Sequence, residues 1–285
     1  MQHSITLNTG AGMPLIGFGT YLIKDPEVCE RAVTSALEAG YRLIDTAQFY
    51  GNEEAVGRAI RKSGIPRDEL FVTTKLWHTD AGDAKTRPAF EASLRRLGLE
   101  YVDLYLIHHP FGDVYGAWRV MEKLYHEGLA RAIGLSNFYP DRLQDLILHF
   151  DVMPAVDQLE THIYHQRHDA RRLMAGHGIA LMAWGPFSQG KTDLLENAVL
   201  KEIAEAHGKT AAQTALRFLT QQNIAVIPKS IHEARIRENI DIFDFSLTDQ
   251  EMARLTALDT RKSAGLTHDD PANVKRIVGF VHPMA

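Results

Sequence analysis

The chain has 285 residues, of which 45% are hydrophobic and 24% are charged, a composition typical of a globular protein that can bury a large core. Its 31 Lys and Arg residues against 36 Asp and Glu residues give a formal net charge of −5, without a long run of one sign, so we expect no nucleic-acid partner. One cysteine, Cys29, excludes an internal disulfide, and the N-terminus "MQHSITLN" has no basic segment before an apolar signal core. No apolar run approaches the roughly 20 residues that cross a bilayer. We therefore predict a cytoplasmic protein without a membrane span.

Helical segments, several of them ending at a glycine, alternate with short apolar strands along the chain. Residues 5–15 predict a hairpin with its turn at 8–12, placed to plug the bottom of a barrel, before a first strand at 14–20. The following helix and strand pairs are 29–40 with 41–45, 55–69 with 70–75, 87–98 with 101–109, 116–128 with 130–136, 141–150 with 153–158, 170–178 with 179–185, and 200–222 with 224–230. Left-handed glycine stops are expected at Gly40, Gly98, Gly128 and Gly178. The rhythm is that of βα repeats.

Two architectures fit such repeats: an open doubly wound sheet and a closed eight-stranded barrel. No linker rich in Pro, Gly or Ser divides the chain, and no strand is followed by a complete GxGxxG, since "GFGTYL" lacks the third glycine. We therefore predict an α/β fold, a (β/α)8 TIM barrel in which residues 1–285 form a single domain.

Polar residues stand at the ends of most predicted strands, where a parallel barrel gathers side chains around one mouth. They are Asp45, Lys75, His108, Ser136, Asn137, Gln158, Trp184, Lys229 and Ser230. The plain alternative is that chains become polar wherever strands end. A carboxylate, an ammonium and an imidazole on three successive strands favour a functional site, because neighbouring strands lie about 4.8 Å apart.

Asp45, Lys75 and His108 form a chemically coherent set with Tyr50. The ammonium of Lys75 is expected to lower the pKa of the Tyr50 phenol by favouring the phenolate, while Asp45 orients Lys75. A neutral His108 imidazole can donate a hydrogen bond to a carbonyl oxygen. The set suits proton delivery to an oxygen that becomes negative as hydride reaches its carbon.

With these residues in place, the sequence resembles the aldo-keto reductases over nearly its whole length. The motifs that carry the resemblance are "YRLIDTAQFYGNE", "VTTKLW", "DLYLIHHP", "AIGLSNF", "AVDQLETH" and "VIPKSIHEARIRENIDIFDFSL". The resemblance implies a (β/α)8 barrel that reduces aldehydes or ketones with NADPH, as a monomer. It matches Asp45, Tyr50, Lys75 and His108 to the family's catalytic tetrad, with Tyr50 as the acid during reduction.

The resemblance also implies a cofactor site. Ser136, Asn137 and Gln158 would hold the carboxamide of a nicotinamide stacked on Trp184, where the family more often has tyrosine. The resemblance also implies that Lys229, Ser230 and Arg235 bind the phosphate of the adenosine ribose. Glu238 and Asn239 would contact the adenine. Two cations facing a dianion favour NADPH over NADH. The plain alternative for this segment is a helix start with surface charges.

The substrate pocket departs from the family pattern. "HHP" places His109 where tryptophan is usual, Tyr21 also replaces a common tryptophan, and Trp77 remains. We therefore expect a pocket for smaller or more polar carbonyl compounds. The short C-terminal segment is expected to form a small lid near the mouth.

Two other signals compete with this interpretation. "GPFSQGKT", Gly185 to Thr192, satisfies the P-loop pattern GxxxxGK[ST] after a strand-like run, which taken alone predicts a nucleotide triphosphatase. Pro186 and Phe187 are bulky for such a loop, and the resemblance instead places the cofactor pyrophosphate near Gly185, Phe187 and Ser188.

His162, His165 and His168 are spaced by three residues, but we expect a solvated loop and no metal site. Asp103 and Asp157 are expected to have internal structural roles. The resemblance also places Asp157 where the family often has asparagine, so its carboxylate could perturb the cofactor amide region. The alternative to an enzyme is a reductase-like protein that binds NADPH as a sensor or structural subunit. The intact tetrad argues against lost chemistry.

Overall fold

The computed structural model describes residues 3–280. Its strands are β1 (Ser4–Thr6), β2 (Gly12–Pro14), β3 (Gly17–Gly19), β4 (Leu43–Asp45), β5 (Phe71–Leu76), β6 (Leu104–Ile107), β7 (Ile133–Ser136), β8 (Val156–Glu160), β9 (Ala180–Trp184) and β10 (Ala225–Val226). Its α-helices are α1 (Pro26–Glu38), α2 (Glu53–Ser63), α3 (Thr86–Leu97), α4 (Val114–His126), α5 (Pro140–His149), α6 (His168–Gly176), α7 (Ala198–Ala206), α8 (Ala211–Thr220), α9 (Glu233–Ile240), α10 (Asp249–Thr256) and α11 (Pro271–Val278).

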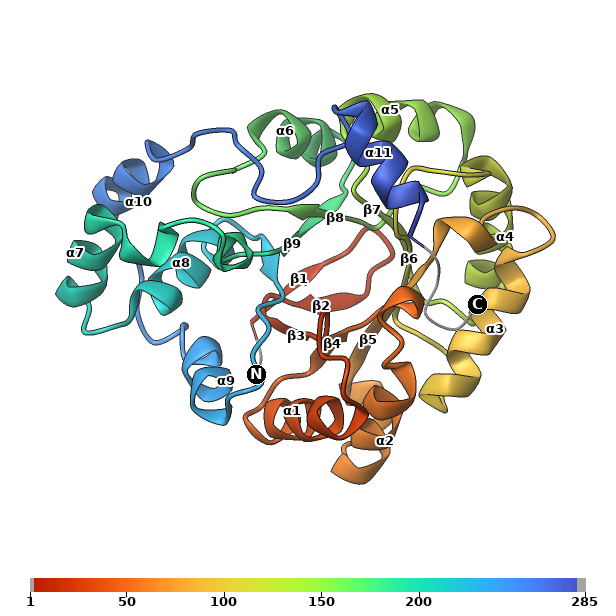
Figure 1. Ribbon diagram of the computed structural model, residues 1–285, viewed down its shortest axis with the longest axis horizontal. Coiled ribbons are helices and arrows are strands. Elements are labelled where there is room, and N and C mark those ends of the chain that lie inside the picture. Colours follow the sequence, from red (N-terminus) through yellow and green to blue (C-terminus); the bar gives the residue numbers. More distant parts are fainter. Residues whose placement is uncertain (1–2, 281–285) are drawn as a thin grey trace.

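Strands β3 to β10 pair in parallel and in sequence order, each with the next. The two outer strands then meet: a parallel bridge joins Ile16 to Val226, and the amide of Gly19 donates to the carbonyl of Pro228 at 3.1 Å. The sheet is thus closed into a barrel, and Figure 1 shows the helices arranged in a ring around it. The predicted (β/α)8 barrel is confirmed.

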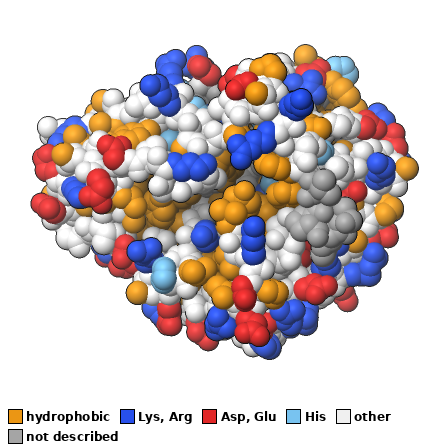
Figure 2. Space-filling view, in the orientation of Figure 1, with side chains coloured by type: hydrophobic (Ala, Val, Ile, Leu, Met, Phe, Trp, Pro, Cys, Tyr) orange, Lys and Arg blue, Asp and Glu red, His pale blue; other side chains and the backbone are white. Residues whose placement is uncertain are grey.

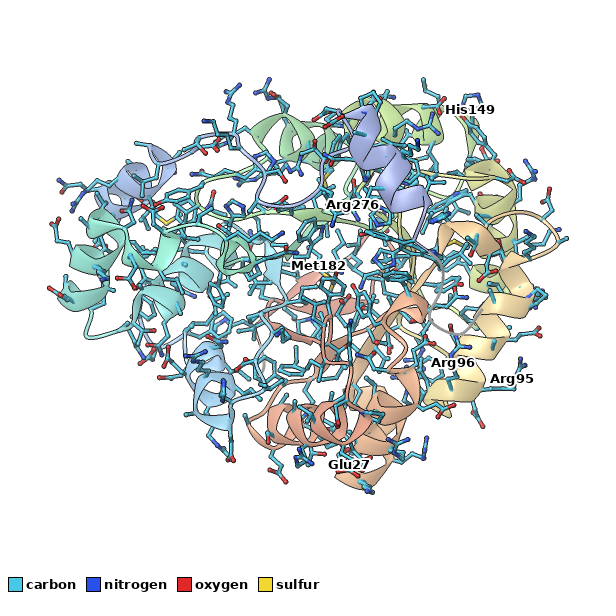
Figure 3. All side chains as sticks on the ribbon, viewed as in Figure 1. Glu27, Arg95, Arg96, His149, Met182 and Arg276 are labelled. Carbon is cyan, nitrogen blue, oxygen red and sulfur yellow. The ribbon has the colours of Figure 1, made fainter. Side chains whose placement is uncertain are left out.

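Alternation along each strand separates two apolar clusters, because successive side chains of a strand point to opposite faces. Val72, Tyr105 and Leu159 pack in the outer cluster against the helices. A smaller inner cluster fills the barrel and includes Val156 and Met182; Met182 lies near the centre of the barrel in Figure 3. Residues one position past an inner side chain therefore face the helices, and those two positions past it face the inside of the barrel again, or its mouth where the strand ends.

The hairpin of β1 and β2 lies across the middle of the ring of helices (Figure 1). Leu7 and Met13, from its turn and its second strand, are buried in the inner cluster beside Leu43 and Phe71. The hairpin therefore closes one end of the barrel, as the sequence predicted, and leaves the other end for chemistry.

Helix ends follow the glycine signals. Gly40, Gly98, Gly128 and Gly178 all have a positive φ, between 66° and 104°, as a left-handed helix stop requires. The segment 200–222, expected as one helical unit, is instead divided into α7 and α8.

The division of that segment has a local cause. Gly208 takes a left-handed φ of 63°, and Thr210 then caps α8 by a reciprocal pair of hydrogen bonds with Gln213, the capping box that starts a new helix. Gly208 is thus a helix stop of the same kind as the others.

The chain after α10 returns to the mouth of the barrel. Residues 259–268, which we call the C-terminal strap, lead into α11, and the indole Nε1 of Trp77 donates to the carbonyl of Phe280 at 3.3 Å. Of the predicted C-terminal segment, residues 279–285, Phe280 thus lies near the mouth as expected, whereas residues 281–285 lie outside the described part of the chain. Within residues 3–280, no helix combines the length and apolar character needed to cross a membrane.

Candidate active site

The mouth opposite the hairpin carries the polar ends of the strands. Asp45 and Lys75 occupy inward positions of β4 and β5, two residues beyond Leu43 and four beyond Phe71 of the inner cluster. His108 directly follows β6 and faces the same way as Leu106. Strand periodicity therefore places three side chains of predicted function on one side of the sheet.

Asp45, Lys75 and Tyr50 form a hydrogen-bonded chain. The Nζ of Lys75 donates to Oδ1 of Asp45 at 2.6 Å, to the carbonyl of Thr46 at 3.0 Å and to the Oη of Tyr50 at 3.3 Å. Tyr50 ends a short 3-10 turn that returns from β4 over the mouth. Its ring meets that of His108 edge to face, with centroids 5.6 Å apart. The structure thus brings together the four residues of the predicted tetrad.

Burial dominates the acid and base properties of this cluster. It raises the pKa of Asp45 and lowers the pKa of Lys75, while the attraction between the two groups opposes both shifts. It also lowers the pKa of His108 well below its usual value, with His109 and Lys75 adding to the effect. His108 is therefore a neutral imidazole, as expected.

The expectation for Tyr50 was wrong in direction. Burial raises the pKa of its phenol well above 10, and the charge of Asp45 raises it further. Asp45, brought in to hold the lysine, also places a negative charge near the phenol. The hydroxyl of Tyr50 consequently keeps its proton throughout the neutral range.

Gln158 has a contact that the sequence did not reveal. Its Nε2 donates to Oδ2 of Asp45 at 2.8 Å and lies 2.9 Å from the sulfur of Met182. Asp45 therefore accepts hydrogen bonds from both Lys75 and Gln158, one on each oxygen. In the sequence, the only indication of this contact was a polar residue at an inward position of β8.

Ser136, Asn137 and Trp184 form a second chain along the mouth. The Oγ of Ser136 donates to the carbonyl of Gln158 at 3.1 Å, and the amide of Asn137 donates to Ser136 at 3.1 Å and to the carbonyl of His108 at 3.0 Å. The indole Nε1 of Trp184 donates to Oδ1 of Asn137 at 2.9 Å. Because Trp184 is only partly buried, its flat ring remains available for stacking.

The segment from β10 into α9 carries the predicted phosphate-binding cations. Lys229 and Arg235 are exposed, and neither forms an ion pair or side-chain hydrogen bond within residues 3–280. Ser230 is buried, and its Oγ accepts from the amide of His232 at 3.0 Å.

The predicted adenine-binding pair lies further along α9. Asn239 is buried, whereas Glu238 accepts from the hydroxyl of Thr210 at 2.7 Å. Glu238 therefore already has a hydrogen-bond partner in Thr210, the N-cap residue of α8.

The loop after β9 does not have P-loop geometry. A P-loop opens directly into a helix, whereas the first α-helix after Gly185 begins at Ala198. Gly185, Ser188 and Gln189 all have positive φ, and the Oγ of buried Ser188 has no hydrogen-bond partner in the described part of the chain. Phe187 packs partly buried against the outer cluster.

The wall of the mouth is aromatic. Trp77 stacks on Phe49 with centroids 3.9 Å apart, and its edge meets the ring of His109 at 5.4 Å. Tyr21 is 43% exposed and lies 5.0 Å from Tyr50, centroid to centroid. Figure 2 shows this face hollowed near its middle, with hydrophobic side chains along the hollow and Lys and Arg around it.

The C-terminal strap is the main feature of the mouth that the sequence did not reveal. Glu160, buried at the end of β8, accepts hydrogen bonds from the hydroxyl of Ser263, from the amide of Ala264 at 2.7 Å and from that of Gly265 at 3.3 Å. A Cβ on Gly265 would lie 2.9 Å from the Trp184 ring. The strap therefore packs directly against the indole.

His162 and His165 lie in the loop after β8, which, contrary to expectation, is not solvated, and His168 begins α6. His162 is fully buried, its Nε2 lies 3.1 Å from Oε1 of Glu160, and it pairs with His165 in an antiparallel bridge. His168 faces Asp259 at 3.4 Å. Among residues 3–280, no group of three or more His, Cys, Asp or Glu side chains is placed to hold a metal ion.

Asp103 and Asp157 lie away from the mouth. Asp103 pairs with Arg67 at 2.7 Å and accepts from the amide of Val72, which agrees with a structural role. Asp157 is fully buried on the outward side of β8, opposite to Gln158, so it does not face the mouth.

Comparison with known proteins gives a consistent result. Residues 15–260 match the model of the Aldo/keto reductase family. The glyoxal reductase of Bacillus subtilis is 44% identical over 271 residues, which cover 95% of this chain and 98% of that protein.

Solved structures agree with these matches. An aldo-keto reductase enzyme from a Medee basin deep-sea metagenome library is 45% identical, with a TM-score of 0.92 over 94% of this chain and 99% of that one. The aldo-keto reductase of Bombyx mori in complex with NADP is 33% identical, with a TM-score of 0.90 over 96% and 97%.

Proposed function

This chain belongs to the aldo/keto reductase family of oxidoreductases, and we propose that it reduces aldehydes or ketones to alcohols with NADPH. One observation carries the proposal: the Oη of Tyr50 lies 3.3 Å from the Nζ of Lys75, which in turn lies 2.6 Å from Asp45, at the rim of the barrel beside His108.

Tyr50 supplies the proton in this proposal. Its raised pKa keeps the phenol protonated until a substrate oxygen becomes strongly basic, and an alkoxide is far more basic than a phenolate. Lys75 stabilises the phenolate once it forms, because a cation within hydrogen-bond distance favours the charged form. The raised pKa therefore determines when the proton leaves and does not prevent its transfer.

His108 and Asp45 position the reacting groups. The neutral imidazole of His108 can donate a hydrogen bond to the carbonyl oxygen without carrying charge into the site. Asp45 holds Lys75 against Tyr50, and Gln158 holds Asp45. Fixed donors of this kind act most strongly when negative charge develops on the oxygen.

The residues around the mouth fit NADPH, which supplies the hydride when bound. Trp184 offers a flat, partly exposed indole, and Ser136 and Asn137 lie next to it. The hydroxyl of Ser188 and the cations Lys229 and Arg235, which have no side-chain partner among residues 3–280, suit phosphate oxygens. The NADP complex of the Bombyx mori relative supports this assignment.

The mouth also limits the substrate. Tyr21, Trp77 and His109 line it, so we propose small or polar carbonyl compounds. The name of the Bacillus subtilis relative, glyoxal reductase, agrees with this size. A single domain over residues 1–285, a monomeric state and a cytoplasmic location remain predictions.

The decisive experiment is Tyr50→Phe, which removes only the phenolic oxygen. We expect kcat for aldehyde reduction to fall by roughly 10²- to 10⁴-fold, while NADPH binding, followed by quenching of tryptophan fluorescence, persists. Tyr101→Phe is the control, since that ring lies against Arg67 and Arg131, away from the mouth. A wild-type protein that binds NADPH but turns over no carbonyl in a broad panel would instead support a sensor.

A further inference from the structure

Glu53, the first residue of α2, is a buried carboxylate outside the mouth of the barrel. Its side chain is 1% exposed, and each of its oxygens accepts a hydrogen bond. Oε1 accepts from the hydroxyl of Thr74 at 2.6 Å, and Oε2 accepts from Nε of Arg96 at 2.6 Å. A buried charge is stable only when it is paired and hydrogen-bonded, so these contacts hold the carboxylate in one place.

The two contacts join Glu53 to different parts of the fold. Arg96 lies on the side of α3 that faces α2, whereas its neighbour Arg95 is exposed on the outer side (Figure 3). Nη2 of Arg96 also donates to the Oγ of buried Ser93 at 3.0 Å. Thr74, in contrast, belongs to β5. The ion pair thus joins two helices, while the hydrogen bond to Thr74 joins α2 to the barrel.

Both ends of the bond between Glu53 and Thr74 are close in sequence to the candidate site. Thr74 directly precedes Lys75 on β5, and Glu53 comes three residues after Tyr50. Strand alternation turns Thr74 to the outer face of the sheet and Lys75 to the inner face. The bond therefore fixes the loop that carries the phenol against the strand that carries the ammonium.

Asn52 holds the same loop against other strands. Its Nδ2 donates to the carbonyls of Thr20 and Ile23 at 3.0 and 3.2 Å, beyond the end of β3. Its Oδ1 accepts from the hydroxyl of Thr46, directly after β4, at 2.8 Å. Of these two buried neighbours, Glu53 is the one that contacts the strand of Lys75.

The contact between Lys75 and Tyr50 is easily lost. Nζ of Lys75 donates to Asp45 at 2.6 Å and to the carbonyl of Thr46 at 3.0 Å, but its distance to the Oη of Tyr50 is 3.3 Å. Hydrogen bonds between N and O are normally no longer than about 3.2 Å. A small shift of the loop away from β5 would therefore separate the phenol from the cation that stabilises its phenolate.

We propose that Glu53 is a positioning residue for the reaction, which keeps the hydroxyl of Tyr50 within reach of Lys75 through its hydrogen bond to Thr74. The inference rests on the proposed reductase function and adds a residue outside the mouth to it. Glu53 does not touch the reacting atoms, because it lies with Thr74 on the outer side of β5. Its removal is expected to lower kcat and to leave substrate and cofactor binding intact.

Two variants remove the contact in different ways. Thr74→Val keeps the shape of the side chain and the charge of Glu53 but deletes the hydroxyl. Glu53→Met is similar in length and removes both acceptor oxygens together with the charge. The double variant completes a thermodynamic cycle. For each protein, steady-state assays at saturating NADPH give kcat and KM for an aldehyde, tryptophan fluorescence gives the Kd of NADPH, and urea unfolding gives the stability.

We expect kcat to fall about tenfold in Thr74→Val, a factor equivalent to about 1.4 kcal/mol, because small displacements of reacting groups slow catalysis strongly. KM for the aldehyde and the Kd of NADPH should stay within about twofold of the wild type, as the loss of a contact needed only in the transition state predicts. Thr74→Ser keeps the hydroxyl and should restore kcat. In the Glu53→Met background, Thr74→Val should lower kcat no further.

Two controls separate positioning from stability. Ser93→Ala deletes a hydrogen bond on the α3 side of the same network, so it should lower the urea midpoint without lowering kcat. Thr73→Val changes the neighbouring residue of β5, whose hydroxyl has no hydrogen-bond partner within residues 3–280. This variant should lower neither quantity.

A Thr74→Val protein that reduces aldehydes with the wild-type kcat overturns the positioning role and leaves the proposed function intact. A fall in kcat of the same size in Ser93→Ala also overturns it, because a general loss of stability then accounts for both variants. If Glu53→Met does not fold, the comparison of Thr74→Val with Thr74→Ser and Ser93→Ala decides. A folded wild type that turns over no carbonyl compound overturns the proposed function and the role of Glu53 with it.

Discussion

Arg235 and Arg237 lie two positions apart on α9 and differ in their partners. Arg237 donates to Glu233 at 2.9 Å, whereas Arg235 is exposed and forms no ion pair in the described part of the chain. A guanidinium without a carboxylate partner can bind a phosphate dianion without first breaking another contact. This difference makes the pair a matched test of cofactor choice.

We expect Arg235→Ala to weaken NADPH binding by roughly 10- to 100-fold, as the loss of charged hydrogen bonds predicts, with little effect on NADH. Titration of both cofactors by fluorescence measures the two constants. Arg237→Ala should change neither of them appreciably. Equal weakening of NADPH and NADH by Arg235→Ala would contradict the assignment.

Asp157 is a buried acid without an adequate partner. Within residues 3–280, neither of its oxygens accepts a hydrogen bond of ordinary geometry. Burial raises its pKa well above 3.8, and the Phe138 amide and the Arg167 charge counter that shift only in part. The folded state therefore favours the neutral carboxylic acid at this position more strongly than the unfolded chain does.

The raised pKa links Asp157 to stability. Between the pKa of Asp in the unfolded chain, about 3.9, and the raised folded value, the folded state binds more protons, so the free energy of unfolding falls as pH rises. Asp157→Asn removes the titrating group and with it this fall in the free energy of unfolding. We expect its stability relative to the wild type to increase with pH by up to about 1.4 kcal/mol per unit, and to level off below pH 4.

Urea unfolding at pH 5, 6, 7 and 8 measures the difference, with the exposed Asp151→Asn as control. A difference between Asp157→Asn and the wild type that does not vary with pH would show that Asp157 is already ionised in the folded protein.

Among the elements, the C-terminal strap depends most on one side chain. Burial opposes ionisation of Glu160, but hydrogen bonds from His162, Ser263 and Ala264 outweigh it and lower its pKa to about 2. The carboxylate therefore stays charged and keeps its donors over all ordinary pH values. Because Gly265 packs on Trp184 and His268 reaches His109, Glu160 positions two parts of the mouth through the strap.

Glu160→Gln keeps the shape of the side chain but turns an N–H group toward one of the strap donors. We expect the free energy of unfolding to fall by about 1 to 3 kcal/mol, cleavage within residues 259–268 to become faster in limited proteolysis, and KM for carbonyl substrates to rise. Glu205→Gln, at an exposed position of α7, is the control. Proteolysis of Glu160→Gln at the wild-type rate would show that other contacts hold the strap.

At the scale of the whole molecule, the closed barrel brings polar residues that are far apart in the sequence together at one mouth. The alternation that puts Leu43, Leu106 and Val156 in the inner cluster also turns Asp45, His108 and Gln158 toward the mouth. The hairpin closes the opposite end, so the polar layer is accessible from one side only. The strand order, the closure of the barrel and the polar positions at the strand ends together form the candidate site.

The sequence by itself predicted the strands, most helix ends and the placement of Asp45, Lys75 and His108 at one end of the sheet, because each depends on local periodicity, on glycine conformation or on the position at which a strand ends. Two predicted helical segments were too long, 55–69 and 200–222, because each contains a left-handed glycine stop, Gly64 in the first and Gly208 in the second. The cofactor and substrate residues came from family motifs rather than from periodicity.

Only the tertiary structure decided the contacts between distant segments. His109 and His268 are 159 positions apart, and Glu160 and Ser263 are 103 apart, with no repeating pattern to link them. The direction of the Tyr50 pKa shift likewise depends on burial and on the placement of Asp45, which no spacing encodes. Desolvation and hydrogen bonding are properties of the packed molecule, because they depend on every group that surrounds a side chain.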